Sequence, residues 1–126
     1  MSFTYSKKEK LKSKKVIEQL FSEGKSVTVF PLRLVYLEYA FDDEIQFKTG
    51  VSVSKRSFKN AVDRNRIKRL LREAYRLNKD RHFNNILASY ALMILYIGKE
   101  KSEFTSIEDS MNELLGAFSK KVSQIK

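Results

Sequence analysis

The sequence has no cysteine among its 126 residues, which excludes disulfide bonds and thiolate metal sites and allows a reducing compartment. It also lacks a long apolar run, since the longest, 90–98, is far too short to cross a bilayer. The N-terminal segment carries lysines with no apolar stretch after them, so we expect no signal peptide. These absences predict a soluble, cytoplasmic protein that does not span a membrane.

Side chains that carry hydrolytic chemistry are equally scarce. There is one histidine, His82, and one acidic cluster, Asp42-Asp43-Glu44. A nuclease made of protein alone needs clustered carboxylates for metal ions, or a pair of histidines. We interpret His82 as a surface or helix-end residue and the acidic cluster as a hairpin turn. We therefore expect no catalytic residue, no protein-bound metal and no cofactor held by the chain itself.

Positive charge, by contrast, is abundant. The chain has 25 Lys and Arg against 15 Asp and Glu, a net charge of +10. The segment 54–81 alone holds eleven basic and three acidic residues. This concentration indicates a polyanionic partner, with nucleic acid as the first candidate and an acidic membrane surface as the second.

The length and 42% hydrophobic content predict one domain spanning residues 1–126, with residues 1–10 disordered. Segment 13–23 has apolar residues at helical spacing after a possible N-cap, Ser13, and before a possible stop, Gly24. Segment 32–39 is rich in β-branched and aromatic residues and predicts a strand.

Segment 45–54 alternates apolar and polar residues, which predicts a second strand paired with 32–39 as a hairpin. A long helix is expected over about 60–79, and the apolar segment 90–97 predicts a third, central strand. Thr105 and Glu108 form a possible capping box for a last helix. The predicted order is α-β-β-α-β-α, a single-domain two-layer α+β sandwich.

The long helix has two distinct faces. On a helical wheel that starts at Arg64, cations and an amide cover one side and apolar residues cover the opposite side. Like charges four residues apart repel each other, so the cationic face suits binding of phosphates. The alternative is a solvated face without a partner. The cationic side comprises Arg64, Asn65, Lys68, Arg69, Arg72 and Arg76, and the apolar side Ile67, Leu70, Leu71, Ala74 and Leu77.

Segment 50–75, GVSVSKRSFKNAVDRNRIKRLLREAY, resembles the signature of the bacterial ribonuclease P protein family. That family has Ser-Lys-Lys or Ser-Lys-Arg at a strand end and Arg-Asn-Arg opening a basic helix, here residues 64–66. The resemblance extends over about residues 11–99. Phe21 matches an aromatic of the family's first helix, whereas Ile17 replaces another, and Lys99 is the cation nearest to where the family often has Arg.

The resemblance implies a fold like ribosomal protein S5 domain 2, with the basic helix in a left-handed crossover. It implies the RNA-binding subunit of ribonuclease P, a hydrolase that removes the 5′ leader of precursor tRNA by endonucleolytic cleavage. In the family the catalytic RNA and Mg²⁺ supply the chemistry, and no protein partner is needed. The implied RNA-subunit contacts are Arg64, Asn65, Arg66, Lys68, Arg69 and Arg72, and the implied leader contacts are Ile17, Phe21, Tyr36, Lys55 and Arg56.

Other interpretations remain open for these residues and for the chain. Phe21 and Tyr36 suit either base stacking or core packing, and Lys55 and Arg56 either RNA contact or solvation. The whole chain also suits a ribosome-type RNA-binding protein. A DNA-binding regulator would insert the basic helix in a major groove, although no helix-turn precedes that helix.

Overall fold

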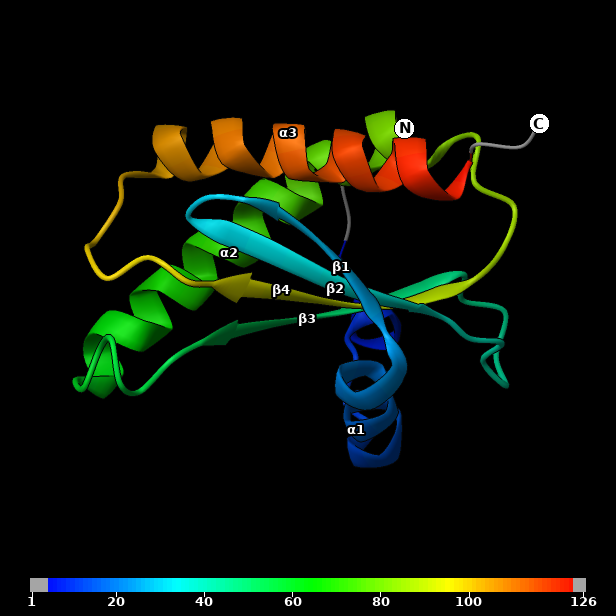
Figure 1. Cartoon of the computed structure of the whole chain (residues 1–126), viewed down its shortest axis with the longest axis horizontal. Helices are drawn as coiled ribbons and strands as arrows, with labels where there is room; N and C mark the ends of the chain where they lie inside the picture. The colour runs from blue at the N-terminus through cyan, green and yellow to red at the C-terminus, as the bar shows by residue number, and fades with distance from the viewer. Residues whose placement is uncertain (1–4, 124–126) are drawn as a thin grey trace.

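The computed structural model describes residues 5–123 as an α+β fold with a four-stranded sheet (Figure 1). Its helices and strands, in chain order, are the short 3₁₀ helix η1 (Lys7–Glu9), α1 (Lys14–Glu23), β1 (Lys25–Val29), β2 (Leu32–Glu38), β3 (Phe47–Val53), α2 (Ala61–Phe83), β4 (Tyr90–Tyr96) and α3 (Phe104–Val122). The predicted central position of β4 is confirmed, because the strand order is β1-β2-β4-β3.

The predicted hairpin between segments 32–39 and 45–54 is wrong. The partner of β2 is the unpredicted strand β1, antiparallel through a turn at Phe30 and Pro31, and β2 pairs with β4 on its other side. The strand β3 lies at the edge of the sheet and pairs with β4, in parallel. Alternation of apolar and polar residues shows which face of a strand is buried but not which strand lies beside it. The acidic cluster 42–44 consequently lies in a loop that connects two non-adjacent strands.

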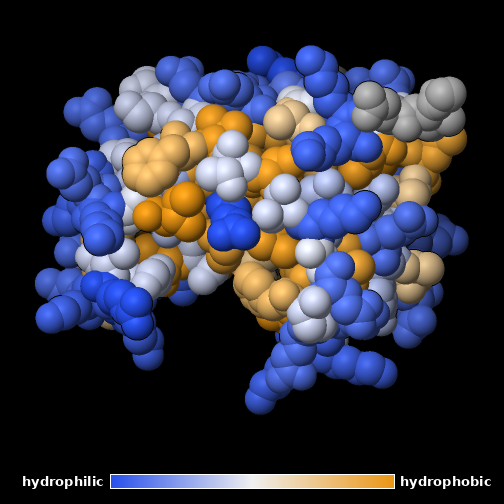
Figure 2. Space-filling view, in the orientation of Figure 1, coloured by the Kyte–Doolittle hydropathy of each residue, from blue (hydrophilic) through white to orange (hydrophobic). Residues whose placement is uncertain are grey.

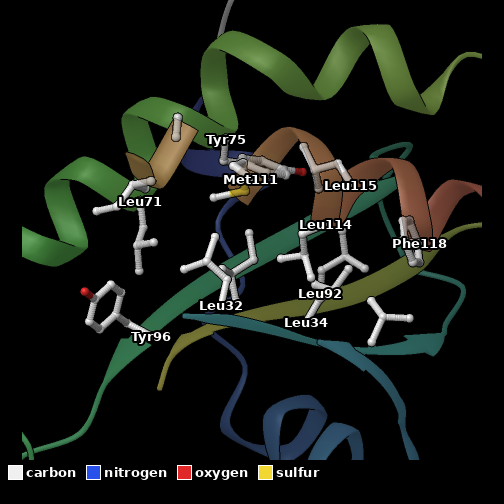
Figure 3. Close-up of a cluster of buried hydrophobic side chains, with 14 of the residues drawn as sticks. Leu32, Leu34, Leu71, Tyr75, Leu92, Tyr96, Met111, Leu114, Leu115 and Phe118 are labelled. Carbon is white, nitrogen blue, oxygen red and sulfur yellow. The ribbon is translucent and has the colours of Figure 1, made fainter. Parts of the chain in front are cut away.

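Helices cover the two faces of the sheet unequally. The long helices α2 and α3 lie together over one face, and the short α1 lies across the other (Figure 1). The predicted two-layer sandwich thus describes the α2 and α3 side, while α1 adds a partial third layer. The larger core fills the space between the sheet and these two helices, with Leu34, Leu92, Leu71, Leu114 and Phe118 among its members (Figure 3).

A smaller core lies beneath α1. It is built from Leu11, Val16, Leu20, Val35, Ala91 and Met93. The Ser13 side chain accepts a hydrogen bond from the Val16 amide at 3.3 Å, which confirms the predicted N-cap of α1. Gly24 ends the helix, and its amide donates to the Leu20 carbonyl.

The other helix ends differ from the sequence prediction. The helix α3 begins one residue before Thr105, with Glu103 as N-cap and no capping side-chain bond. Glu108 instead accepts a hydrogen bond from the buried Asn78 of α2 at 3.1 Å, so its carboxylate joins two helices and does not cap one. The helix α2 continues past the predicted end to Phe83, because that ring packs on Phe47 and Phe118.

Residues 1–10 were predicted to be disordered, but residues 5–10 are held against the sheet. Residues 1–4 lie outside the described residues. The Tyr5 hydroxyl donates to the Thr49 carbonyl, and its ring packs edge-on against Tyr75 at 5.3 Å. Lys10 forms a bridge to Thr49, and Glu9 forms an ion pair with Lys79 at 3.3 Å. This segment therefore covers the outer edge of β3, which would otherwise be a free strand edge.

Within residues 5–123 no helix is both long enough and apolar enough to cross a membrane.

Candidate RNA interface

The basic helix α2 starts from a tight junction with β3. Arg64 Nη1 donates hydrogen bonds to the carbonyls of Phe58 at 2.8 Å and Lys59 at 2.9 Å. The Phe58 ring is buried and lies 5.9 Å from the Tyr96 ring at the end of β4. Arg64 is only half-exposed as a result. Its guanidinium stabilises the junction, in contrast to the sequence prediction that it points outward.

The exposed side of α2 carries Asn65, Arg66, Arg69 and Arg72. Lys68 belongs to the same side but is half-buried. None of these four cations forms an ion pair within the part of the chain that the structure describes. Unpaired guanidinium groups in a row present several donors in a planar geometry that fits phosphate oxygens.

Arg76 differs from the cations before it on the helix. It forms a salt bridge with Glu73 at 2.6 Å, and this bond holds the pKa of the Glu73 carboxyl below its usual range. Both side chains are exposed to solvent, so the pair adds little to stability. Its effect is local neutralisation, and the unpaired cations of α2 therefore lie mainly in its first half.

The buried side of α2 is centred differently from the predicted apolar side. It comprises Ile67, Leu71, Ala74, Tyr75 and Asn78, whereas Leu70 and Leu77 are only half-buried. Tyr75, which the wheel places among the cations, is 1% exposed, and its hydroxyl accepts a hydrogen bond from Thr49 Oγ1 at 2.8 Å. Burial raises the pKa of the Tyr75 hydroxyl. The sequence contained no signal for this, since Tyr75 is buried by β3 and the N-terminal segment.

The face of the sheet beneath α1 is only partly covered. Leu95 of β4 packs at the edge of the α1 core, and it pairs with Ser52 of β3 and Arg33 of β2. Paired residues point to the same side of a sheet, so these three side chains form a row next to α1. Figure 2 shows the molecule hollowed here, between α1 and the junction of β3 with α2. We call this hollow the α1-side trough.

The two elements that flank this trough, α1 and the segment after β3, carry four of the predicted leader contacts. Phe21 on α1 is 51% exposed, and Ile17, one helical turn earlier, is half-buried against the α1 core. Lys55 and Arg56 follow the end of β3 and are exposed. Of the two elements beside the trough, the helix thus carries apolar groups and the segment after β3 carries cations.

Tyr36, the fifth predicted leader contact, does not lie in the trough. It is 7% exposed on the opposite face, where its ring packs edge-on against Phe118 at 5.1 Å and Tyr90 at 6.2 Å. Burial raises the pKa of its hydroxyl. Its neighbour Val35 faces α1 instead. The prediction that Tyr36 and Phe21 share one cleft is wrong, because successive residues of a strand point to opposite faces.

Arg33 is a residue of the trough that the sequence prediction missed. It is exposed, and its Nη2 donates to Ser26 Oγ on β1 at 3.3 Å. The signal was present, since Arg33 is two residues before Val35 and therefore on the same face. Recognising it required knowing which face of β2 lies against α1.

The residues that could have suggested protein-based chemistry have structural partners. His82 lies in the last turn of α2, as predicted, with Nε2 at 3.1 Å from Asn112 Oδ1. Asp43 pairs with Lys48 at 2.9 Å, and this hydrogen bond holds the pKa of the Asp43 carboxyl below its usual range. Among residues 5–123 no three His, Asp or Glu side chains gather closely enough to hold a metal ion.

Comparison with known proteins finds relatives in the family that segment 50–75 resembles. A protein named Ribonuclease P protein component from Porphyromonas gingivalis is 40% identical over 121 residues, covering 90% of this chain and 85% of the relative. One of the same name from Syntrophus aciditrophicus is 35% identical over 99 residues, covering 79% and 76%. The solved RNase P protein of Staphylococcus aureus superimposes with a TM-score of 0.68 at 25% identity, covering 92% of this chain and 98% of that one.

The match to the family is continuous along the chain. The family model described as Ribonuclease P matches residues 5–119, which include α1, the whole sheet, α2 and most of α3. The resemblance noted in segment 50–75 is therefore confirmed and extends into the last helix. The chain belongs to the ribonuclease P protein family.

Proposed function

We propose that this protein is the RNA-binding subunit of ribonuclease P and assists a catalytic RNA in removing the 5′ leader of precursor tRNA. The observation that carries the proposal is the exposed, unpaired row of Arg66, Arg69 and Arg72 on α2. Three guanidinium groups without acidic partners on one helix face are best satisfied by a phosphate backbone.

In this proposal α2 binds the RNA subunit. Asn65, Arg66, Lys68, Arg69 and Arg72 contact its backbone. Arg64 has a positioning role, because its guanidinium holds the β3–α2 junction through two carbonyls. Arg64 thereby fixes the direction in which α2 leaves the sheet and presents the other cations.

The α1-side trough is proposed to hold the single-stranded leader. Phe21 is exposed enough to stack on a base, with Ile17 beside it, and Lys55 and Arg56 can bind flanking phosphates. Arg33 joins this set from the sheet. Tyr36 supports the sheet from the other face and is not included.

Bond cleavage is assigned to the RNA subunit and the Mg²⁺ ions that it binds. The protein contributes charge and position: it lowers phosphate repulsion between two RNAs and holds the leader extended. We place this function in the cytoplasm, without a membrane or a further protein partner. The parallel strands β3 and β4 are joined through α2, which is a β-α-β crossover. The proposal also keeps the S5-like classification and the left hand of this crossover, both of which rest on the family resemblance.

The test is reconstitution with a ribonuclease P RNA at low Mg²⁺. Cleavage of precursor tRNA is measured for the RNA alone, the protein alone and the two together. We expect correct cleavage only from the combination under these conditions. Correctly placed, metal-dependent cleavage by the RNA-free protein would refute the division of labour. No gain over RNA alone would favour a ribosome-type RNA-binding protein.

A further inference from the structure

A second hollow opens at the end of the sheet, next to the α1-side trough. It is a cavity of about 470 Å³, which is within the range of small-ligand sites. Two of the large hydrophobic residues exposed in residues 5–123 line it, Phe30 at 71% and Ile97 at 38%. The lining residues are Phe30, Pro31, Tyr96, Ile97, Gly98, Lys99, Glu100, Lys101 and Ser102, and we call the hollow the Phe30 pocket.

The fold builds this pocket from two segments far apart in sequence. The first residue of β2 pairs with the last residue of β4, and the Ile97 amide then donates to the Pro31 carbonyl at 2.8 Å. The chain approaches so closely at Gly98 that a Cβ there would lie 2.9 Å from the Pro31 ring. Any larger residue at position 98 would have to displace Pro31. Because the two segments approach this closely, the β1–β2 turn and the β4–α3 loop form one surface.

The loop that forms the far wall is held in place by hydrogen bonds. The Tyr96 hydroxyl lies 2.5 Å from the Glu100 carbonyl and 2.6 Å from Ser102 Oγ. Lys101 Nζ forms an ion pair with Asp63 of α2 at 3.0 Å. Lys99 is exposed and forms no ion pair within the described residues, and the exposed Glu100 carboxylate is the acid of the lining.

The Phe30 pocket is continuous with surfaces already assigned to RNA. Residues 91, 93 and 95 of β4 face α1, so Ile97 continues the same face to the end of the strand. Val53 of β3 also pairs with the last residue of β4, which brings the following Lys55 and Arg56 to this end of the sheet. The face of β4 that lies in the trough at Leu95 therefore continues into the lining of the Phe30 pocket at Ile97.

The chemistry of the lining fits one kind of occupant. An exposed aromatic ring beside apolar walls stacks a flat, partly apolar group, and an unpaired ammonium next to it binds an anion. An unpaired nucleotide has both, a base and a phosphate. The net charge of +10 and the exposed arginines of α2 favour an RNA strand over a neutral peptide.

We propose that the Phe30 pocket binds one unpaired nucleotide of the precursor-tRNA leader, with the base against Phe30 and the phosphate at Lys99. This inference rests on the proposed function and deepens it, because it adds a second base-binding position beyond Phe21. The Phe30 pocket binds the nucleotide without sequence specificity, since every base can stack on an aromatic ring.

The test uses the reconstituted holoenzyme and two precursor tRNAs, one with a leader long enough to span trough and pocket and one with a one-nucleotide leader. Substrate affinity is measured for wild type, Phe30→Ala and Phe30→Trp. Leu87→Ala is the matched control, because Leu87 is 91% exposed and lies outside the Phe30 pocket. Since Phe30 is also mostly exposed, its substitution should leave folding intact, which thermal unfolding verifies.

We expect Phe30→Ala to weaken binding of the long-leader substrate by about 5- to 150-fold, the equivalent of one lost stack. Phe30→Trp should restore binding, and neither variant should affect the one-nucleotide substrate. Wild-type affinity of Phe30→Ala for the long leader would overturn the inference, as would an equal loss on both substrates. If wild type itself gains nothing from a longer leader, the leader-binding part of the proposed function fails as well.

Discussion

Val35 and Tyr36 are neighbours in β2, yet their side chains stabilise two different cores. Val35 packs beneath α1 with Met93, whereas Tyr36 packs against Phe118 of α3. A shift of one residue along this strand therefore changes which helix a side chain contacts, and with it the role that the residue can have.

Tyr36→Ala should destabilise the fold by about 3 kcal/mol, because it removes a buried ring from two aromatic neighbours, Tyr90 and Phe118. Phe21 is half-exposed on α1, so Phe21→Ala should change the free energy of unfolding by about 0.5 kcal/mol or less. The same variant should weaken binding of substrates with a leader. Urea unfolding and substrate affinity separate the two effects. If Tyr36→Ala kept wild-type stability but lost leader affinity, Tyr36 would belong to the leader site as the sequence predicted.

Arg64→Ala and Arg69→Ala should differ although both residues belong to the basic helix. Loss of Arg64 leaves two junction carbonyls without their charged donor, and we expect a cost of about 2 kcal/mol in the free energy of unfolding. Arg69 is exposed and unpaired, so its removal should leave stability unchanged and weaken only binding to the RNA subunit. Equal stability of the two variants would contradict the positioning role of Arg64.

Binding to the RNA subunit should depend strongly on salt. The five cations among the predicted RNA-subunit contacts would give a slope of log K against log salt of about −4, but one of them, Arg64, is held by the junction. The remaining four, Arg66, Lys68, Arg69 and Arg72, predict about −3. Arg69→Gln should make the slope less steep by about 1. A slope near zero would mean that this face of α2 is merely solvated.

The N-terminal segment should be sensitive to alkaline pH. Burial raises the pKa of Tyr5 to about 12, with Arg72 opposing and Glu9 adding to the effect, from 10.0 in the unfolded chain. The unfolded chain therefore loses this proton first, and the contribution of Tyr5 is complete below about pH 10 and falls as pH rises toward 12. Because Tyr5 is only partly buried, we expect a loss of about 1–2 kcal/mol.

Tyr5→Phe provides the comparison, since it keeps the ring and removes the titrating group. Urea unfolding of both proteins at several pH values between about 9 and 12 should show the advantage of wild type shrinking as pH rises. If the unfolding free energies of the two proteins changed in parallel over this pH range, the contacts of Tyr5 with Tyr75 and Thr49 would not be raising its pKa.

Local sequence by itself determined the helices, the strand β4 and the basic character of α2. Ser13 caps α1 through its own hydroxyl, and the apolar run 90–97 has no polar position that could face water. Segment 50–75 also identified the family, because twenty-six residues in register leave few alternatives. These features depend on neighbouring residues, so they can be recognised without knowing what packs against them.

Tertiary structure alone decided which strands pair and which face each residue occupies. The strand β1 is short and is identified only by its pairing with β2. The partner of β3 is β4, which follows the whole of α2 in the sequence. Tyr75 lies on the cationic side of the helical wheel, yet it is buried because β3 and Tyr5 pack over it. Arg64 donates hydrogen bonds to backbone carbonyls that precede the helix. The Phe30 pocket exists because the β1–β2 turn meets the end of β4, a contact between distant segments that no local pattern encodes.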